Sequence, residues 1–334
     1  MLYSKYEDFL TFLKGKKILI TTHDLVDIDG FVSCYALRFF LIQHCNKPIS
    51  IFFSELSKHT KNFMLRFSEK FPEFHFNHKS EVNFSEFDVC IINDTNDLSQ
   101  IQFNCSKTIK LEIPYIFIDH HHFGKNILKN GNISSLNLIN DNVSSTTEII
   151  LELFEYYSQN LTTPYKNLIV TAILTDSGFF KYGNNQTIKK VSNLLDEEVN
   201  FQQLLLMLKT DVDISERIAK IKGLQRVKLI RKGDYLIGIS NVSSFGASVA
   251  SMLIRTGFDI SIIYSKEKDK NMINSRAKKS ICMKTGLHLG KIFEEISEYS
   301  EGSGGGHDGA AALTFKADFD TVLLKIVERI KHFL

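Results

Sequence analysis

The sequence predicts an α/β protein: an N-terminal parallel-sheet domain with helices on both faces, a helical connector and a smaller C-terminal α/β domain. Three observations support this prediction. Short apolar strands alternate with helices as far as residue 118, helical spacing dominates from residue 144 to residue 224, and strands return afterwards. A chain of 334 residues is also longer than one simple domain. We expect the domains to cover residues 1–196, 197–224 and 225–334.

The first half of the chain has the pattern of a parallel α/β domain. Short apolar runs rich in β-branched residues predict buried strands, and apolar residues that recur every three or four positions predict helices. The expected elements are a helix at 2–14, a strand at 17–22, a helix at 31–43, a strand at 49–53, a helix at 57–70, and strands at 88–92 and 115–118.

The second half begins with helices, and strands follow. All four prolines lie at or before Pro164, so no proline interrupts the later helices. The expected elements are helices at 144–158, 165–175, 187–196 and 200–224, strands at 226–231 and 235–239, a helix at 246–256, strands at 259–264 and 272–275, and a helix at 319–333. A polar hairpin turn is expected at 266–271 and a glycine-rich loop at 302–309.

Composition and charge narrow the classes of function. Apolar residues make up 43% of the chain and charged residues 23%, as in ordinary soluble globular proteins. The net charge is only +2, which argues against a protein that binds long duplex DNA and favours a short anionic ligand. The five cysteines have no CxxC spacing and predict reduced core thiols. The sequence shows neither a signal peptide nor a membrane-spanning run, so we expect a cytoplasmic protein.

Three consecutive histidines follow the strand at 115–118, directly behind Asp119. Ligands of open α/β sheets bind at the carboxyl ends of the strands. His120, His121 and His122 would therefore lie where a metal ion or a phosphate binds. A surface cluster without a function is the alternative, and the residues that follow the other strands decide between the two.

The loop after the first strand carries four further potential ligands, His23, Asp24, Asp27 and Asp29. Clustered carboxylates repel one another, and a folded protein keeps such a cluster when a cation neutralises it. The alternative is a helix N-cap, with Asp29 capping the helix that follows. A cap needs only one residue, so we favour metal binding.

Two more acids occupy comparable positions. Asp94 is among the first side chains after the strand at 88–92, although a segment rich in Asn and Asp is also typical of a plain turn. Asp176 follows an apolar helix, where it could equally be a residue of the helix terminus. The complete set of candidate ligands is two imidazoles and four carboxylates: His23, Asp27, Asp29, Asp94, His120 and Asp176.

Four carboxylates balance the charge of two divalent ions. Oxygen and nitrogen ligands without a thiolate suit Mn²⁺, with Mg²⁺, Fe²⁺ or Co²⁺ as alternatives. Two ions about 3.5–4 Å apart are the usual device for in-line displacement at phosphorus. We expect Asp94 to bridge the ions and the water between them to be the nucleophile.

A glycine-rich segment near the C-terminus is the candidate substrate site. Gly304, Gly305 and Gly306 allow backbone N–H groups to approach a phosphate. The alanines that follow His307 are expected to start a helix whose N-terminus favours anions. Arg276, directly after the strand at 272–275, is a candidate clamp for phosphate. A flexible loop and a solvated surface arginine are the alternatives.

In order and spacing, these segments resemble the DHH phosphoesterase superfamily. The matching segments are HDLVDIDG at 23–30, NDTND at 93–97, DHH at 119–121, SSTTE at 144–148 and TDSGFF at 175–180, while GGGH at 304–307 is similar to the DHHA1 domain. The resemblance spans nearly the whole chain. Val32 and Ser33 depart from the Gly-Ser pair of the oligoribonuclease type, and Ala312 stands where a glycine is common.

The resemblance implies an active site in the cleft between the domains. The six candidate ligands would bind two Mn²⁺ ions, and Asp119 would support the first imidazole of the histidine cluster. His121 would contact the scissile phosphate or serve as general acid. Arg276, the glycines at 304–306 and His307 would hold the terminal phosphate and nucleotide of the substrate. The resemblance assigns no role to His122 or Asp24.

The leading hypothesis is a Mn²⁺-dependent phosphohydrolase similar to nanoRNases, oligoribonucleases and pAp phosphatases, and related to RecJ. Its substrates would be short oligoribonucleotides, linear or cyclic dinucleotides such as pApA, or 3′-phosphoadenosine 5′-phosphate. A RecJ-like exonuclease of single-stranded DNA is the alternative enzyme, although that type adds an OB-fold for which this layout has no room. The non-enzymatic alternative is a nucleotide-binding regulatory protein. We expect no duplex DNA and no membrane as partners, and a homodimer stays open.

Overall fold

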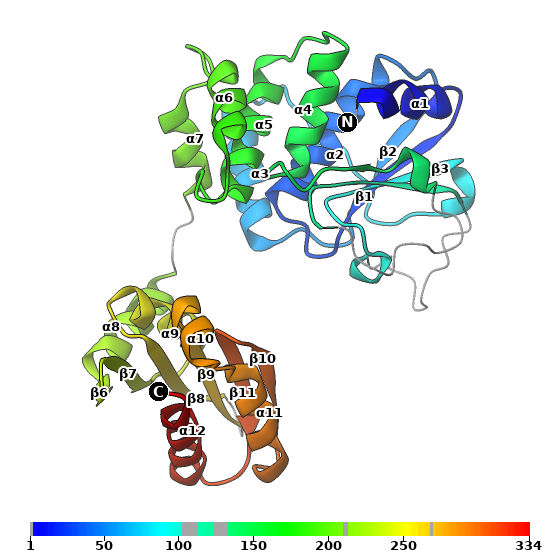
Figure 1. Ribbon diagram of the computed structural model, residues 1–334. Helices are drawn as coiled ribbons and strands as arrows, with labels where there is room; N and C mark the ends of the chain where they lie inside the picture. Colours follow the sequence, from blue (N-terminus) through cyan, green and yellow to red (C-terminus); the bar gives the residue numbers. More distant parts are fainter. Residues whose placement is uncertain (1–2, 102–112, 123–132, 210–212, 268–269) are drawn as a thin grey trace. The chain divides into compact units, whose positions relative to one another are not determined.

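The computed structural model describes residues 3–101, 113–122, 133–209, 213–267 and 270–334. The chain divides into two units, Met1–Thr210 and Asp211–Leu334. Figure 1 shows the helices and strands of both units. Among the described residues, no helix is long and apolar enough to cross a bilayer.

A five-stranded parallel sheet forms the centre of the first unit (Figure 1). The strands are β1 (Ile18–Thr22), β2 (Ile49–Ile51), β3 (Val89–Asn93), β4 (Tyr115–Asp119) and β5 (Leu138–Ile139), in the spatial order β2-β1-β3-β4-β5. Every residue of β1, β3 and β4 is buried, as expected for a parallel sheet covered on both faces. The first four strands confirm the predicted ones, whereas β5 is not among the predicted elements.

Helices cover both faces of this sheet, as predicted. On one face Ile20, Ile91 and Ile118 share a hydrophobic core with the α-helices. On the other face Leu19 and Ile92 pack in a smaller core with the 3₁₀ helices η1 and η2. The helices are α1 (Tyr3–Leu13), α2 (Ile28–Ile42), α3 (Lys58–Lys70), η1 (Phe84–Glu86), η2 (Leu98–Gln100), η3 (Ser134–Leu136), α4 (Thr146–Tyr156), α5 (Thr163–Asp176), α6 (Asn185–Leu194) and α7 (Phe201–Leu208).

The strand order places a topological switch point beside β1. The chain passes from β1 through α2 to β2 on one side of β1, and β3 and β4 lie on the other side. Connections that diverge in this way leave a crevice at the carboxyl edge of the sheet, where ligands bind in open α/β folds. His23 directly follows β1, Asp94 follows β3 and His120 follows β4. These three candidate ligands therefore lie at the carboxyl edge of the sheet.

A six-stranded sheet forms the second unit, in the order β10-β11-β9-β8-β7-β6. β7 and β8 are parallel, and the other adjacent pairs are antiparallel. The elements are α8 (Ile214–Gln225), β6 (Lys228–Lys232), β7 (Tyr235–Asn241), α9 (Gly246–Arg255), β8 (Ile260–Glu267), β9 (Lys270–Ala277), α10 (Lys279–Thr285), α11 (Leu289–Tyr299), β10 (Ser303–His307), β11 (Ala310–Phe315) and α12 (Phe319–Phe333). One core packs α8 and α9 against the sheet, and another packs α11 and α12 against it.

The glycine-rich segment is a strand, so the prediction of a loop was wrong. β10 forms an antiparallel hairpin with β11, and the alanines after His307 continue β11 instead of starting a helix. Glycine is disfavoured in strands, but tertiary packing overrides that preference here. A β-carbon on Gly304 would lie 2.6 Å from the carbonyl oxygen of Phe293 in α11. Glycine therefore lets β10 lie close to this helix.

Three further predictions differ from the structure or lie partly outside it. The predicted helix at 200–224 is two helices, α7 and α8, with residues 210–212 outside the described part. α10 and α11 are not among the predicted elements. Of the predicted turn at 266–271, residues 268–269 lie outside the described part. The described cysteines, Cys34, Cys45, Cys90 and Cys282, are buried and free as predicted, whereas Cys105 lies outside the described residues.

Candidate metal centre

His23 directs one ring nitrogen toward two carboxylates. Its Nδ1 lies 2.7 Å from the carbonyl oxygen of Asp24. A carbonyl only accepts hydrogen bonds, so Nδ1 carries the proton of the neutral ring and Nε2 keeps its lone pair. Nε2 lies 3.5 Å from Oδ2 of Asp94 and 3.7 Å from Oδ1 of Asp27. The hydrogen bond to Asp24 thus prepares His23 to bind a cation through Nε2.

The helix cap of α2 is Asp27, not Asp29. Oδ1 of Asp27 accepts the backbone N–H of Gly30 at 3.0 Å, whereas Asp29 lies in the first turn of the helix and is buried. Gly30 is required for close packing, because a β-carbon there would lie 2.6 Å from Oγ1 of Thr22. Asp27 therefore caps the helix, and this loop can still supply carboxylate oxygens to a cation.

Asp29 is held by the N-terminus of α4. Its two carboxylate oxygens accept the backbone N–H groups of Thr146 at 2.7 Å and Thr147 at 3.1 Å. Free N–H groups and the helix dipole favour a carboxylate at this position, and each oxygen retains a lone pair for a cation. The sequence reasoning missed these two amides. The Ser-x-x-Glu spacing of Ser145 and Glu148 is typical of a helix N-terminus. This spacing was the sequence signal that could have indicated free backbone N–H groups here.

Asp94 lies between the two imidazoles. It follows β3 with a φ of +57°, a left-handed conformation that is uncommon for a residue other than glycine. Oδ2 faces His23, while Oδ1 lies 3.5 Å from Nε2 of His120. Oδ1 also accepts a hydrogen bond from the hydroxyl of Thr146 at 3.1 Å. One carboxylate oxygen faces each imidazole, as in a carboxylate that bridges two ions.

His120 and Asp176 face each other on the second side of Asp94. Nε2 of His120 lies 3.0 Å from Oδ2 of Asp176, and both atoms are buried without a hydrogen-bond partner among the described residues. Such orphaned atoms are rare and need an explanation. Neighbouring ligands of an octahedral ion with bonds of about 2.1 Å lie about 3 Å apart. The spacing of these two atoms therefore fits a shared cation.

All six predicted ligands fall into two of the three clusters of potential ligands within the described residues, while the third cluster joins Asp94 and His120 to Asp119 and His121. The donor atoms of each group lie within 4.8 Å of one another, and the groups are His23, Asp27 and Asp94, and Asp29, His120 and Asp176. Each group contains two carboxylates and one imidazole. This oxygen and nitrogen donor set suits divalent ions of the Mn²⁺ or Mg²⁺ type. The residues present thus fit a pair of ions with Asp94 between them.

The electrostatics indicate a need for positive charge at these groups. Burial disfavours protonation of His23 and His120, but the negative charge of the neighbouring carboxylates outweighs it and raises the pKa of each imidazole to about 11. Burial opposes ionisation of Asp94 as well, yet the two imidazoles hold its pKa well below the usual range. Burial raises the pKa values of Asp29 and Asp176. A divalent ion can replace the imidazolium charge, because a metal-binding imidazole is neutral.

Asp119 pairs with His121, not with His120 as predicted. Its Oδ1 lies 2.8 Å from Nδ1 of His121 and accepts the backbone N–H of the same residue at 3.2 Å. This hydrogen bond raises the pKa of His121. Asn96 donates to Oδ2 of Asp119 at 2.7 Å. Sequence reasoning missed Asn96, because an Asn in a turn carries no signal for a partner 23 positions away.

His122 and Asp24 lie outside both ligand groups. Nδ1 of His122 lies 2.8 Å from Oδ2 of Asp141, and its side chain is 91% exposed. Asp24 accepts a hydrogen bond from the hydroxyl of Ser54 at 2.6 Å. Both residues have polar partners at the margin of the site.

The predicted substrate residues lie in the second unit, in one row across three strands. Arg276 of β9 lies opposite Ala310 of β11, and Ala310 lies opposite His307 of β10. Directly opposed residues project from the same face, and adjacent strands are about 4.8 Å apart. The exposed side chains of Arg276 and His307 thus start roughly 10 Å apart on one face, with a small alanine between them.

Two cavities adjoin the ligand groups. One has a volume of about 300 Å³ and is lined by polar residues that include His23, Asp94 and His121. The other has a volume of about 360 Å³ and more apolar walls. Asp27 and Asp176 line both cavities, so the two volumes meet at candidate metal ligands.

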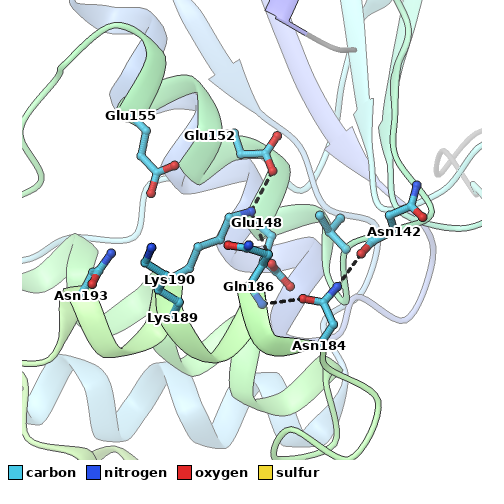
Figure 2. A pocket seen from close by; sticks show the side chains of 10 residues that line it. Asn142, Glu148, Glu152, Glu155, Asn184, Gln186, Lys189, Lys190 and Asn193 are labelled. Atoms are coloured by element: carbon cyan, nitrogen blue, oxygen red, sulfur yellow. Dashed lines mark hydrogen bonds and ion pairs between the residues drawn. The ribbon is translucent and has the colours of Figure 1, made fainter.

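A larger cavity of about 500 Å³ is lined by none of the predicted site residues. Figure 2 shows how Lys190 lies among its acidic residues. Nζ of Lys190 lies 3.4 Å from Glu148 and 2.7 Å from Glu152, and Glu148 also accepts the N–H and hydroxyl of Ser144. The lysine and the two carboxylates compensate one another, so this cavity does not share the charge pattern of the metal centre.

Comparisons with known proteins follow the same two-part division. Residues 17–175 match the DHH family, N-terminal domain, and residues 245–334 match the DHHA1 domain. An uncharacterised protein of Methanocaldococcus jannaschii is 29% identical over 330 residues, which cover 97% of this chain and 94% of that protein.

Solved structures share the fold. An exopolyphosphatase-related protein from Bacteroides fragilis has a TM-score of 0.67 at 17% identity, and the match covers 98% of this chain and 96% of that one. The DHH domain of a protein described as a member of a ribosomal protein family has a TM-score of 0.50 at 14% identity, covering 98% and 89%.

Proposed function

Because the chain belongs to the DHH family of metal-dependent phosphoesterases and carries a C-terminal DHHA1 domain, we propose that it hydrolyses short nucleotide substrates with two Mn²⁺ ions. The proposed substrates are short oligoribonucleotides and dinucleotides such as pApA, cyclic dinucleotides, and 3′-phosphoadenosine 5′-phosphate. The proposed activity is that of a phosphohydrolase acting on phosphodiester or phosphomonoester bonds.

The observation that carries this proposal is the position of Asp94. Its two oxygens face two imidazoles, and each imidazole belongs to a separate group of two carboxylates and one histidine. When bound, a pair of divalent ions neutralises charge on a phosphate and activates water for in-line attack. The protein contributes the spacing of the ligands, which the packing of α4 and the turn after β3 hold in place.

His121 is the residue that we place beside the reacting phosphate. It lines the polar cavity next to Asp94, and its hydrogen bond to Asp119 directs Nε2 away from that carboxylate. In the proposed hydrolysis, a water oxygen bonds to phosphorus, the bond from phosphorus to the leaving oxygen breaks, and the leaving oxygen takes up a proton. His121 donates this proton or binds a phosphate oxygen.

Arg276 and His307 are the residues that we propose for the terminal phosphate of the substrate. Both are exposed and share one face of the second sheet. Arginine binds phosphate through paired N–H groups. A clamp of two residues suits a short ligand, and the net charge of only +2 does not favour a long polyanion.

The test is Mn²⁺-dependent release of AMP from pApA. Wild-type protein is expected to release AMP with Mn²⁺ and to lose that activity with EDTA. Asp94→Ala is expected to be inactive, while Asp97→Ala, which changes an acid of the same segment outside the ligand groups, is expected to stay active.

A wider set of substrates separates the alternatives. Turnover should be compared for pAp, pApA, cyclic dinucleotides and single strands of increasing length. Absence of Mn²⁺-dependent turnover of all of them would favour a nucleotide-binding regulatory protein. Processive degradation of long single-stranded DNA with sparing of dinucleotides would favour the exonuclease alternative.

A further inference from the structure

The apolar cavity beside the metal centre has walls that differ from those of its polar neighbour. Its volume is about 360 Å³, at the lower end of the range for small-molecule sites. Ile28, Phe179 and Leu208 supply apolar surface, and His59 and Thr175 supply polar surface. Three carboxylates form the side that the cavity shares with the ligand groups: Asp27, Asp29 and Asp176. A ligand of this cavity therefore meets apolar side chains at one end and candidate metal ligands at the other.

Phe179 is exposed at this cavity in an unusual backbone conformation. The residue is 54% exposed, although a large aromatic residue is ordinarily buried where the fold allows it. Gly178, Phe179 and Phe180 all have positive φ values, of +59°, +57° and +67°. Consecutive left-handed residues are costly for L-amino acids.

Hydrogen bonds hold this strained turn in place. The N–H of Phe179 donates to the carbonyl oxygen of Leu174 at 2.7 Å, and the N–H of Phe180 donates to the hydroxyl of Ser177 at 3.0 Å. Strained residues persist where the surroundings determine them, and they cluster at ligand sites. The turn holds the ring of Phe179 at the wall of the cavity instead of in the core.

We propose that this cavity binds a nucleobase that stacks on Phe179, belonging to the nucleotide whose phosphate lies at the metal centre. The inference rests on the proposed function, because the base can reach this cavity only if the phosphate of the same nucleotide lies at the adjoining ligand groups. A nucleobase is uncharged, planar and apolar on its faces, which suits the cavity walls. Stacking tolerates every base, since each has a π-face, so several nucleotides fit.

The test compares the binding of AMP with the binding of ribose 5-phosphate, which has the same phosphate but no base. Calorimetric titrations with saturating Mn²⁺ are expected to show tighter binding of AMP by the wild type. Phe179→Ala is expected to weaken AMP binding roughly 5- to 150-fold, the range that one stacked base supplies, and to leave ribose 5-phosphate unchanged.

Three further variants separate stacking from general damage. Phe179→Tyr keeps a ring and is expected to bind AMP nearly as the wild type does, whereas Phe179→Leu keeps an apolar side chain without a ring and is expected to bind weakly. Tyr182→Ala removes an aromatic side chain of the same turn that is 71% exposed and does not line the cavity. It is expected to bind AMP normally.

Equal affinity of the wild type for AMP and ribose 5-phosphate overturns the inference, and so does unchanged AMP binding in Phe179→Ala or Phe179→Leu. Failure of the proposed function looks different. In that case AMP still binds more tightly than ribose 5-phosphate, and Phe179→Ala still weakens AMP binding, but pApA is not hydrolysed with Mn²⁺.

Discussion

Oδ1 of Asp119 lies 2.8 Å from Nδ1 of His121 and also accepts the backbone N–H of that residue at 3.2 Å. Two hydrogen bonds to one oxygen determine the direction of the imidazole, so Nε2 of His121 faces away from Asp119. Asn96 holds the second oxygen of Asp119 at 2.7 Å. Asp119 is therefore a positioning residue for His121.

Asp119→Asn should lower kcat with little effect on Mn²⁺ affinity. The amide keeps the shape of the carboxylate but loses its charge, and loss of such a supporting partner costs about 10- to 100-fold in activity. His122→Ala is the matched control, since its side chain is 91% exposed and lies outside both ligand groups. Loss of Mn²⁺ binding in Asp119→Asn would instead make Asp119 a metal ligand.

Mn²⁺ should stabilise the wild type and not Asp94→Ala. A ligand at 100 times its Kd adds about 2.7 kcal/mol to the free energy of unfolding. Asp94 contributes an oxygen toward each of the two ligand groups, so its removal weakens both. Thermal unfolding with and without MnCl₂ measures this difference. An equal shift of Tm in the two proteins would contradict the prediction that Asp94 binds both ions.

Mn²⁺ binding near pH 7.5 should release protons and become tighter as the pH rises. The neighbouring carboxylates raise the pKa values of His23 and His120 to about 11, so these imidazoles are charged in the metal-free protein, and a metal ion must displace their protons. Titration calorimetry in buffers with different ionisation enthalpies counts the protons. In the metal-free protein, the stability that these raised pKa values contribute is present below about pH 6.5. This stability is lost as the pH rises toward 11.

A Mn²⁺ affinity that does not change with pH would refute the prediction that binding displaces these protons.

Asp29→Ala should destabilise the metal-free protein more than Asp27→Ala. Asp29 is buried and accepts two backbone N–H groups of α4, so its loss leaves two buried donors without a partner, at a cost of roughly 2–4 kcal/mol. Asp27 is a partly exposed cap, which is worth about 1 kcal/mol. Urea unfolding in EDTA measures both values, and equal losses would argue against the role of Asp29 in holding α4.

Gly304→Ala and Gly305→Ala should separate packing from substrate contact in β10. A β-carbon at Gly304 would lie 2.6 Å from a carbonyl oxygen of α11, whereas the nearest atom to one at Gly305 is 3.8 Å away. Gly304→Ala is expected to lose roughly 1–3 kcal/mol of stability, and Gly305→Ala to change it by less than about 0.5 kcal/mol. Weaker substrate binding by a stable Gly305→Ala protein would support a role of this glycine in contacting phosphate.

Local patterns predicted the framework of the first unit and the residues of its site. The strands that end before His23, Asp94 and His120 are short apolar runs, and parallel strands bring their carboxyl ends to one edge. Polar residues directly after such strands consequently meet. The ligand set could be proposed because its spacing depends on this topology more than on side-chain detail.

The sequence by itself determined the alternation of strands and helices and the edge at which the candidate ligands gather, because both follow from apolar spacing along the chain. Only the tertiary structure decided that Asp119 supports His121, that α4 holds Asp29 and that the glycines form a strand. The first depends on the exact turn after β4. The other two depend on contacts between distant segments, where close packing and buried hydrogen bonds outweigh local preference.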